Sequence, residues 1–221
     1  MIGNHVAYRR VRENVGELLR STRAAAELRV PACPEWTVHD LLRHLVEVAR
    51  VVRGRLTGAV PAELDPGLSR AELLQQWAEF GGEVERVLEQ RPGGTGRQLV
   101  ADAFTHELDL RCALAQPLPT EHCAYVSAFE FGIAGLDRSL REHRLPALLL
   151  EADGAKWTAG DGEPAASVRA TRVDLYRSLA GRRTVAQIAR LSWSAPPEPW
   201  LPAFTWGPFT PPTRPVEDMT G

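Results

Sequence analysis

The fold of this chain is decided by the stretch Trp36–Leu56, which reads WTVHDLLRHLVEVARVVRGRL. Its apolar residues recur at the three- and four-residue spacing of an amphipathic helix. Thr37 is placed as the N-cap, with Asp40 three residues later as a variant of the capping box. On such a helix His44 lies at the margin of the apolar stripe, whereas His39 projects from the opposite side. The two histidines therefore have different prospects as ligands.

A second helical stretch, residues 98–115, carries two further potential ligands. Asp102 and His106 are four residues apart, so their side chains converge on one face of the helix. Asp109 follows His106 by three residues and borders the same face. Glu107 is turned by about 100° from His106, and we expect it to be solvated.

These residues together predict a metal site made of His44, Asp102 and His106. A carboxylate and an imidazole one turn apart can chelate a divalent ion, and a third ligand from another helix leaves a coordination position open for water, thiolate or substrate. Each part also has a simpler interpretation. Asp102 and His106 alone could be an ordinary hydrogen-bonded pair, and His44 alone a histidine at the edge of the core. A hydrogen-bonded network of all three residues without metal is the corresponding structural alternative.

Longer motifs surround these positions in a fixed order. They read VPACPEWTVHDLLRHL (residues 30–45), ADAFTHELDLR (101–111), GEPAASVRA (162–170) and AGRRT (180–184). With them the chain resembles the mycothiol-dependent maleylpyruvate isomerase family over nearly its whole length. The resemblance implies a DinB-like, up-and-down four-helix bundle at the N-terminus. It also implies mycothiol as the low-molecular-weight thiol co-substrate.

The resemblance further implies a divalent metal, usually zinc, at His44, Asp102 and His106. Asp102 departs from the family pattern, which has glutamate at that place, and a shorter side chain moves the ion closer to the helix. Asp109 matches a family aspartate and is expected to orient a ligand.

Arg182 and Arg183 match the family's Gly-Arg element and, with Asp109, complete the candidate catalytic residues. Either arginine could pair with a substrate carboxylate or with cofactor hydroxyls. As charges after a helix they could equally complement the helix dipole.

Composition agrees with an enzyme acting on small molecules. The 221 residues carry a formal net charge of −2, and no basic run interleaved with aromatic residues is present, so we expect no nucleic-acid partner. No apolar stretch is long enough for a signal peptide or a membrane span, which predicts a cytoplasmic protein without membrane contact. We expect a monomer or homodimer. Three cysteines without CxxC spacing indicate no disulfide framework. Cys33, between Pro31 and Pro34, is expected to be structural because no histidine neighbour is evident.

Helical periodicity continues to about residue 143, and the sequence pattern then changes to that of short strands. We predict helices over 4–28, 36–56, 69–88, 98–115 and 121–143, with connectors at 58–68 and 91–96 and a bend at Gly81-Gly82. Beyond Pro146, short β-prone runs separated by Asp153-Gly154 and Asp161-Gly162 predict an antiparallel meander. Two capped helices follow, at Thr171 and Thr184, and then a tail rich in tryptophan and proline that is expected to wrap along the protein. The predicted fold class is therefore α+β, with a helical metal-binding domain over 1–145 and a small α+β domain over 146–221.

The function predicted from these features is a metal-dependent mycothiol S-transferase or isomerase. It would activate a thiol on a zinc-like ion for addition to a small electrophile. The alternative is a non-catalytic, metal-dependent small-molecule binding or regulatory protein that uses the same pocket.

Overall fold

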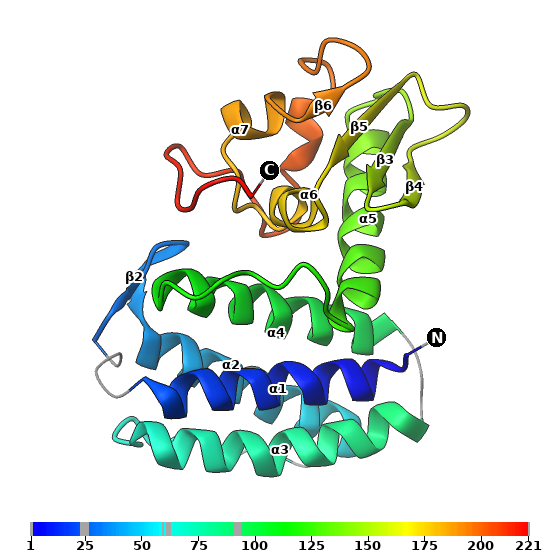
Figure 1. Ribbon diagram of the computed structural model, residues 1–221. Coiled ribbons are helices and arrows are strands. Elements are labelled where there is room, and N and C mark those ends of the chain that lie inside the picture. Colours follow the sequence, from blue (N-terminus) through cyan, green and yellow to red (C-terminus); the bar gives the residue numbers. More distant parts are fainter. Residues whose placement is uncertain (1, 23–26, 59, 61–62, 91–93, 221) are drawn as a thin grey trace. The chain divides into compact units, whose positions relative to one another are not determined.

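The computed structural model describes residues 2–22, 27–58, 60, 63–90 and 94–220. It divides into two compact units, Met1–Ala128 and Phe129–Gly221 (Figure 1). Helix α5 (Ala124–Glu142) begins in the first unit and continues into the second. The predicted domain boundary after residue 145 lies just beyond the end of this helix and stays a prediction.

The first unit is a bundle of four long helices. These are α1 (Asn4–Ser21), α2 (Val38–Thr57), α3 (Arg70–Gln90) and α4 (Gly94–Ala113). Helices α1 and α2 each pack against α3 and α4, and Figure 1 shows the four helices side by side. This is the predicted helical bundle. No helix in the described part of the chain is long and apolar enough to cross a membrane.

Helix α2 begins at the predicted capping box and ends where the predicted connector begins. The Thr37 side chain accepts a hydrogen bond from the Asp40 backbone, and the Asp40 carboxylate accepts one from the Thr37 backbone, which completes the capping box. At the other end Gly58 adopts a left-handed conformation with φ of 76°, which glycine reaches without a steric penalty. Between these caps Leu41 and Leu45 are buried in the bundle core.

The entry to α2 is more ordered than predicted. Helix α1 ends at Ser21 rather than near residue 28, because Thr22 is already extended. Residues 23–26 of the predicted helix lie outside the described residues. The chain then forms a hairpin of β1 (Arg29–Val30) and β2 (Cys33–Thr37), which leads directly into α2.

The predicted bend at Gly81-Gly82 was wrong, because α3 is continuous through both glycines. A Cβ at Gly81 would lie 2.8 Å from Cδ of Arg12, so this glycine serves the close approach of α1 to α3. Arg12 in turn donates to the buried carboxylate of Glu85, and Arg9 donates to the same group. The expected connector 91–96 also differs, since α4 already begins at Gly94 and 91–93 lie outside the described residues.

The second unit contains a four-stranded sheet in the order β4-β3-β5-β6. The strands are β3 (Leu148–Ala152), β4 (Ala155–Ala159), β5 (Ala166–Ala170) and β6 (Ser192–Trp193). The prediction of an antiparallel meander is only half right. Strand β4 returns antiparallel to β3 through Asp153-Gly154, whereas β5 pairs with β3 in parallel. The second Asp-Gly pair therefore belongs to a crossover that carries the chain to the other side of β3.

The remaining elements of this unit are α6 (Arg172–Leu179), α7 (Val185–Ala189) and the short helix η1 (Leu201–Phe204). Thr171 and Thr184 cap α6 and α7 as predicted. The tail packs along its own unit, as expected for a segment rich in tryptophan. Trp200 stacks on Trp193 and donates to the Pro146 carbonyl, and Trp206 packs against Phe131.

Candidate metal centre

Helices α2 and α4 bring the three predicted metal ligands together within the first unit. Nε2 of His44 lies 3.6 Å from Oδ1 of Asp102, and Nε2 of His106 lies 3.9 Å from the same oxygen. One potential ligand atom from each residue lies within 4.8 Å of the others. A tetrahedral ion with bonds of about 2.0–2.1 Å places its ligand atoms about 3.3 Å apart, so small side-chain movements would let all three atoms bind one ion.

Two atoms of this cluster are buried without a hydrogen-bond partner among the described residues. They are Nε2 of His44 and Oδ2 of Asp102. A buried polar atom that lacks a partner costs free energy, on the order of 1–3 kcal/mol. A bound cation would satisfy both atoms, since neutral imidazole and carboxylate are common ligands of divalent metals. The donor set therefore fits a zinc-like ion.

Asp109 lies behind His106 and contacts its other ring nitrogen. Oδ2 of Asp109 is 3.0 Å from Nδ1 of His106, and the Asp109 side chain is fully buried. Because an ionised carboxylate can only accept, this contact places the hydrogen of His106 on Nδ1 and leaves Nε2 free to face Asp102. Sequence spacing found Asp109, since it borders the same helical face as His106.

The expectation that Cys33 has no histidine neighbour was wrong, because Cys33 lies close to His106. Its sulfur, a ring nitrogen of His106 and a carboxylate oxygen of Asp109 lie within 4.8 Å of one another. The hairpin β1–β2 creates this proximity, and no pattern in the sequence predicted the hairpin. Trp36 was missed for the same reason: its ring centroid lies 5.0 Å from that of His44 and 6.0 Å from that of His106.

The expectation that Glu107 is solvated was wrong, because its side chain is fully buried. One carboxylate oxygen accepts hydrogen bonds from Asn14 of α1 and from Arg111, and the other lies 3.6 Å from Nε2 of His122. Burial raises the pKa of Glu107 despite these partners. Helical angle alone could not predict this, since α4 is covered on several sides and its polar residues find buried partners instead of water.

His122 completes this second polar cluster, on the side of α4 that faces α1. Its ring stacks on Phe104 with centroids 4.7 Å apart, and Nδ1 accepts from the Ala124 backbone. Burial, followed by the positive charges of Arg111 and Arg10, lowers the pKa of His122 to about 4. His122 is therefore neutral near pH 7 and holds the start of α5 in place.

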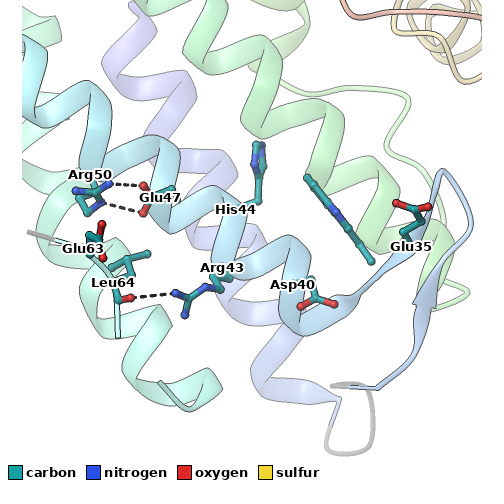
Figure 2. A pocket seen from close by; sticks show the side chains of 9 residues that line it. Glu35, Asp40, Arg43, His44, Glu47, Arg50, Glu63 and Leu64 are labelled. Carbon is teal, nitrogen blue, oxygen red and sulfur yellow. Dashed lines mark hydrogen bonds and ion pairs between the residues drawn. The ribbon is translucent and has the colours of Figure 1, made fainter. Parts of the chain in front are cut away.

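Two cavities lie next to the candidate metal centre, and both are lined by His44 and Glu47. The larger encloses about 720 Å³ and is polar (Figure 2). Its cationic groups are already engaged: Arg43 donates to the backbone carbonyls of Leu64 and Asp65, and Arg50 pairs with Glu47. The smaller encloses about 420 Å³ between α2 and α4 and has mainly apolar walls.

Arg182 and Arg183 belong to the second unit, where the Arg182 side chain donates to the Ala180 carbonyl. Arg183 is fully buried and pairs with Asp174 of α6 and with Glu217 of the tail. Their role with substrate stays a prediction. The contacts of Arg183 are those of an internal ion pair.

The sequence matches the family model described as the mycothiol maleylpyruvate isomerase N-terminal domain over residues 8–130. The chain belongs to this family, as the motifs around His44 and His106 predicted. No curated protein is similar enough to the chain in sequence to count as a match.

Two solved structures have a similar fold. One is the mycothiol-dependent maleylpyruvate isomerase, with a TM-score of 0.57, and the other is a histidine-to-alanine mutant of that name, with a TM-score of 0.59. Each is 12% identical to this chain and is similar over 87% of this chain and 92% of the other. At this identity the likeness establishes the fold, and the predicted α+β class with a DinB-like bundle is confirmed.

Proposed function

We propose that this protein is a metal-dependent thiol S-transferase or isomerase. In this proposal His44, Asp102 and His106 hold a divalent ion, zinc in the first place, and mycothiol is the thiol co-substrate. One observation carries the proposal: Nε2 of His44 and Oδ2 of Asp102 are buried without a hydrogen-bond partner among the described residues. Both residues belong to the cluster in which His44, Asp102 and His106 each offer a potential ligand atom within 4.8 Å of the others. Membership of a family named for a mycothiol-dependent isomerase supports the choice of thiol.

The residues around the ligands have separate tasks. Asp109 holds the proton of His106 on Nδ1, so that Nε2 presents a lone pair to the metal. Trp36 lies against both imidazole rings and in this proposal would limit the access of water to the ion. Three protein ligands leave a coordination position open. A bound ion would lower the pKa of a thiol at that position, so that thiolate predominates near neutral pH.

The proposed substrate is a small electrophile with a conjugated double bond. The thiolate adds to one carbon, a carbon–sulfur bond forms, and the π electrons move to the conjugated acceptor. If the bond to sulfur breaks again after rotation, the thiolate is regenerated and the product is an isomer. If the adduct instead takes up a proton at carbon, the product is a thioether. Both reactions therefore begin with the same addition.

The metal part of the proposal is tested by elemental analysis of protein prepared without chelators. We expect about one divalent ion per chain, as a single tetrahedral site requires. His44→Ala and His106→Ala should lose most of the bound metal. His39→Ala is the matched control and should retain it, because His39 is on the same helix but outside the ligand cluster. Metal at background level in the unmodified protein, even after zinc titration, would leave a hydrogen-bonded network as the better interpretation.

The thiol part is tested on cobalt-substituted protein. Addition of mycothiol should produce a sulfur-to-cobalt charge-transfer band, and His106→Ala should abolish it. Consumption of mycothiol with a panel of conjugated electrophiles then separates an enzyme from a binding protein. A charge-transfer band without turnover on any electrophile would favour the non-catalytic binding or regulatory alternative. Thiol binding that persists after the metal is stripped would contradict the mechanism.

A further inference from the structure

The smaller cavity beside the candidate metal centre is lined by polar residues at one end and by aliphatic residues along its walls. At one end it is lined by His44 and Asp102, two of the proposed ligands. Its walls are mainly the aliphatic side chains of Val48, Val51 and Leu99. A volume of about 420 Å³ lies within the range of roughly 300–1,000 Å³ that small-molecule sites occupy. The cavity is therefore large enough for an organic ligand that reaches the metal.

The spacing of residues along α2 explains this lining. Val48, Val51, Val52 and Arg55 follow His44 at positions i+4, i+7, i+8 and i+11, which share one face of a helix. On α4 the positions run in the opposite direction, from Asp102 through Leu99 to Gln98. At a rise of about 1.5 Å per residue, Arg55 lies roughly 16 Å along the helix axis from His44. The cavity is thus elongated, with the metal ligands and Arg55 at opposite ends.

Arg55 differs from the other arginines of this region. It is exposed, and it has no hydrogen bond or ion pair with any residue in the described part of the chain. In the polar cavity, by contrast, Arg43 and Arg50 are already bound to backbone carbonyls and to Glu47 (Figure 2). The free guanidinium beside the two cavities therefore belongs to the apolar one. Gln98 lines the same cavity and adds an amide donor.

We propose that the apolar cavity binds the electrophilic substrate, and that this substrate has an elongated hydrophobic body with an anionic group at the Arg55 end. The proposal rests on the proposed function, because that function places the reacting carbon near His44 and Asp102. Valine and leucine walls disfavour a small substrate that is charged throughout, since burial of an unpaired charge is costly. Arg55 supplies the counter-charge for a carboxylate, sulfonate or phosphate.

Binding of an unreactive probe to the purified, full-length protein tests this proposal by calorimetry. Octanesulfonate has the expected body and charge, binds metal ions weakly and cannot react with a thiol. It should bind more tightly than hexanesulfonate by about 15-fold, which corresponds to roughly 0.8 kcal/mol for each of two methylene groups. It should also bind more tightly than 1-octanol, which lacks the charge. Equal affinities across the three probes would overturn the proposal.

Variants then assign the two ends of the cavity. Arg55→Met keeps an apolar stem of similar length and should weaken octanesulfonate about tenfold while leaving 1-octanol unchanged. Arg86→Met, an exposed arginine on α3, is the matched control and should change neither. Val51→Thr places a hydroxyl in the apolar wall and should weaken both probes several-fold, whereas Val126→Thr at an exposed position should not. An unchanged affinity in Arg55→Met and in Val51→Thr would contradict the assignment.

The result of the probe-binding experiment does not depend on the proposed thiol chemistry. Probe binding requires neither mycothiol nor turnover, and the cobalt–thiol band requires neither Arg55 nor Val51. Failure of the probes with an intact thiol band would remove only the substrate assignment. Loss of the thiol band with intact probe binding would remove the proposed function and leave a binding cavity.

Discussion

Oδ2 of Asp109 lies 3.0 Å from Nδ1 of His106, and this contact determines which ring nitrogen of His106 faces Asp102. In the proposed metal site this is the arrangement of a carboxylate behind a histidine ligand. Partners of this type orient the imidazole and raise its basicity, and their loss lowers metal affinity by about 10–100-fold.

Asp109→Asn should therefore weaken metal binding by about that factor without unfolding the protein, because an amide can donate to Nδ1 and favour the wrong tautomer. Competition with a chromogenic chelator measures the affinity. Glu107→Gln is the matched control, since Glu107 is the other buried carboxylate of this helix turn but faces Asn14 and His122. Equal losses in both variants would show that the effect reflects packing and not the orientation of His106.

Asp102→Glu is expected to keep the metal, because the longer side chain restores the residue that the family resemblance implies at this position. Asp102→Ala should lose most of the metal, as should removal of either histidine ligand. The cobalt–mycothiol band reports the difference directly, and altered turnover in Asp102→Glu would reflect the changed place of the ion. Loss of metal in Asp102→Glu equal to that in Asp102→Ala would argue against Asp102 as a ligand.

Helical periodicity predicted which potential ligands share a helix face, and the family resemblance predicted that the two faces form one metal site. His44 lies on one face of α2, and Asp102 and His106 lie on one face of α4, whatever the details of their packing. Contacts between distant segments were not predictable in this way. Trp36 and Cys33 reach the histidines through the hairpin β1–β2, whose two-residue first strand carries almost no sequence pattern.

Two errors share a further cause. Glu107 was placed in solvent by its helical angle, but Asn14, Arg111 and His122 supply buried partners for it. The sheet was expected to be a meander because each Asp-Gly pair resembles a hairpin turn. Only the pair at Asp153 joins neighbouring antiparallel strands, while the chain after the second pair crosses to the parallel partner. In both cases contacts with distant segments of the chain decide the outcome, and the local sequence pattern does not contain them.

The low pKa of His122 predicts a pH-dependent stability. Burial keeps His122 neutral in the folded protein down to about pH 4, whereas the unfolded chain protonates it near pH 6.5. Between these values the unfolded state binds more protons, so the free energy of unfolding is highest above pH 6.5 and falls as the pH is lowered towards 4. The loss is at most on the order of 3 kcal/mol. Urea denaturation across this pH range measures it.

Glu107 requires a control in this experiment because its raised pKa acts in the opposite direction. A carboxyl group with a raised pKa contributes stability at low pH that is lost as the pH rises through that value. Glu107→Gln removes this contribution and should retain the slope due to His122. The double variant Glu107→Gln/His122→Gln should lose the part of the slope that His122 contributes, and the slope that remains belongs to carboxylates such as Glu47 and Glu151, whose pKa values are lowered by hydrogen-bonded cationic partners. A slope in the double variant equal to that in Glu107→Gln would assign the effect to groups other than His122.

The proposed domain boundary can be tested by limited proteolysis of the full chain. Arg141 and Arg144 are exposed at and just beyond the end of α5. We expect trypsin to cut there early, and cleavage after Arg144 should release fragments of residues 1–144 and 145–221, as measured by mass spectrometry. The first half of α5 contains no lysine or arginine, so chymotrypsin, which cleaves after aromatic residues such as Tyr125 and Phe129, tests the alternative, and early cleavage there would place the boundary near residue 128.

The last prediction separates a structural from a catalytic role for Arg183. Its guanidinium is fully buried and donates to Oδ1 of Asp174, with Nη2 at 2.7 Å, and to Glu217, which also accepts from Arg177. Arg183→Met would leave buried carboxylate charge without its partner. Removal of one member of such a buried network typically costs about 3–5 kcal/mol, so we expect a large loss in urea denaturation monitored by tryptophan fluorescence. Arg182→Met should cost much less, since Arg182 is only partly buried and bonds a nearby carbonyl. If Arg183→Met kept the stability of the unmodified protein but raised KM for an anionic electrophile, the internal ion pair would not be its main role, and the predicted contact with substrate would be the better explanation.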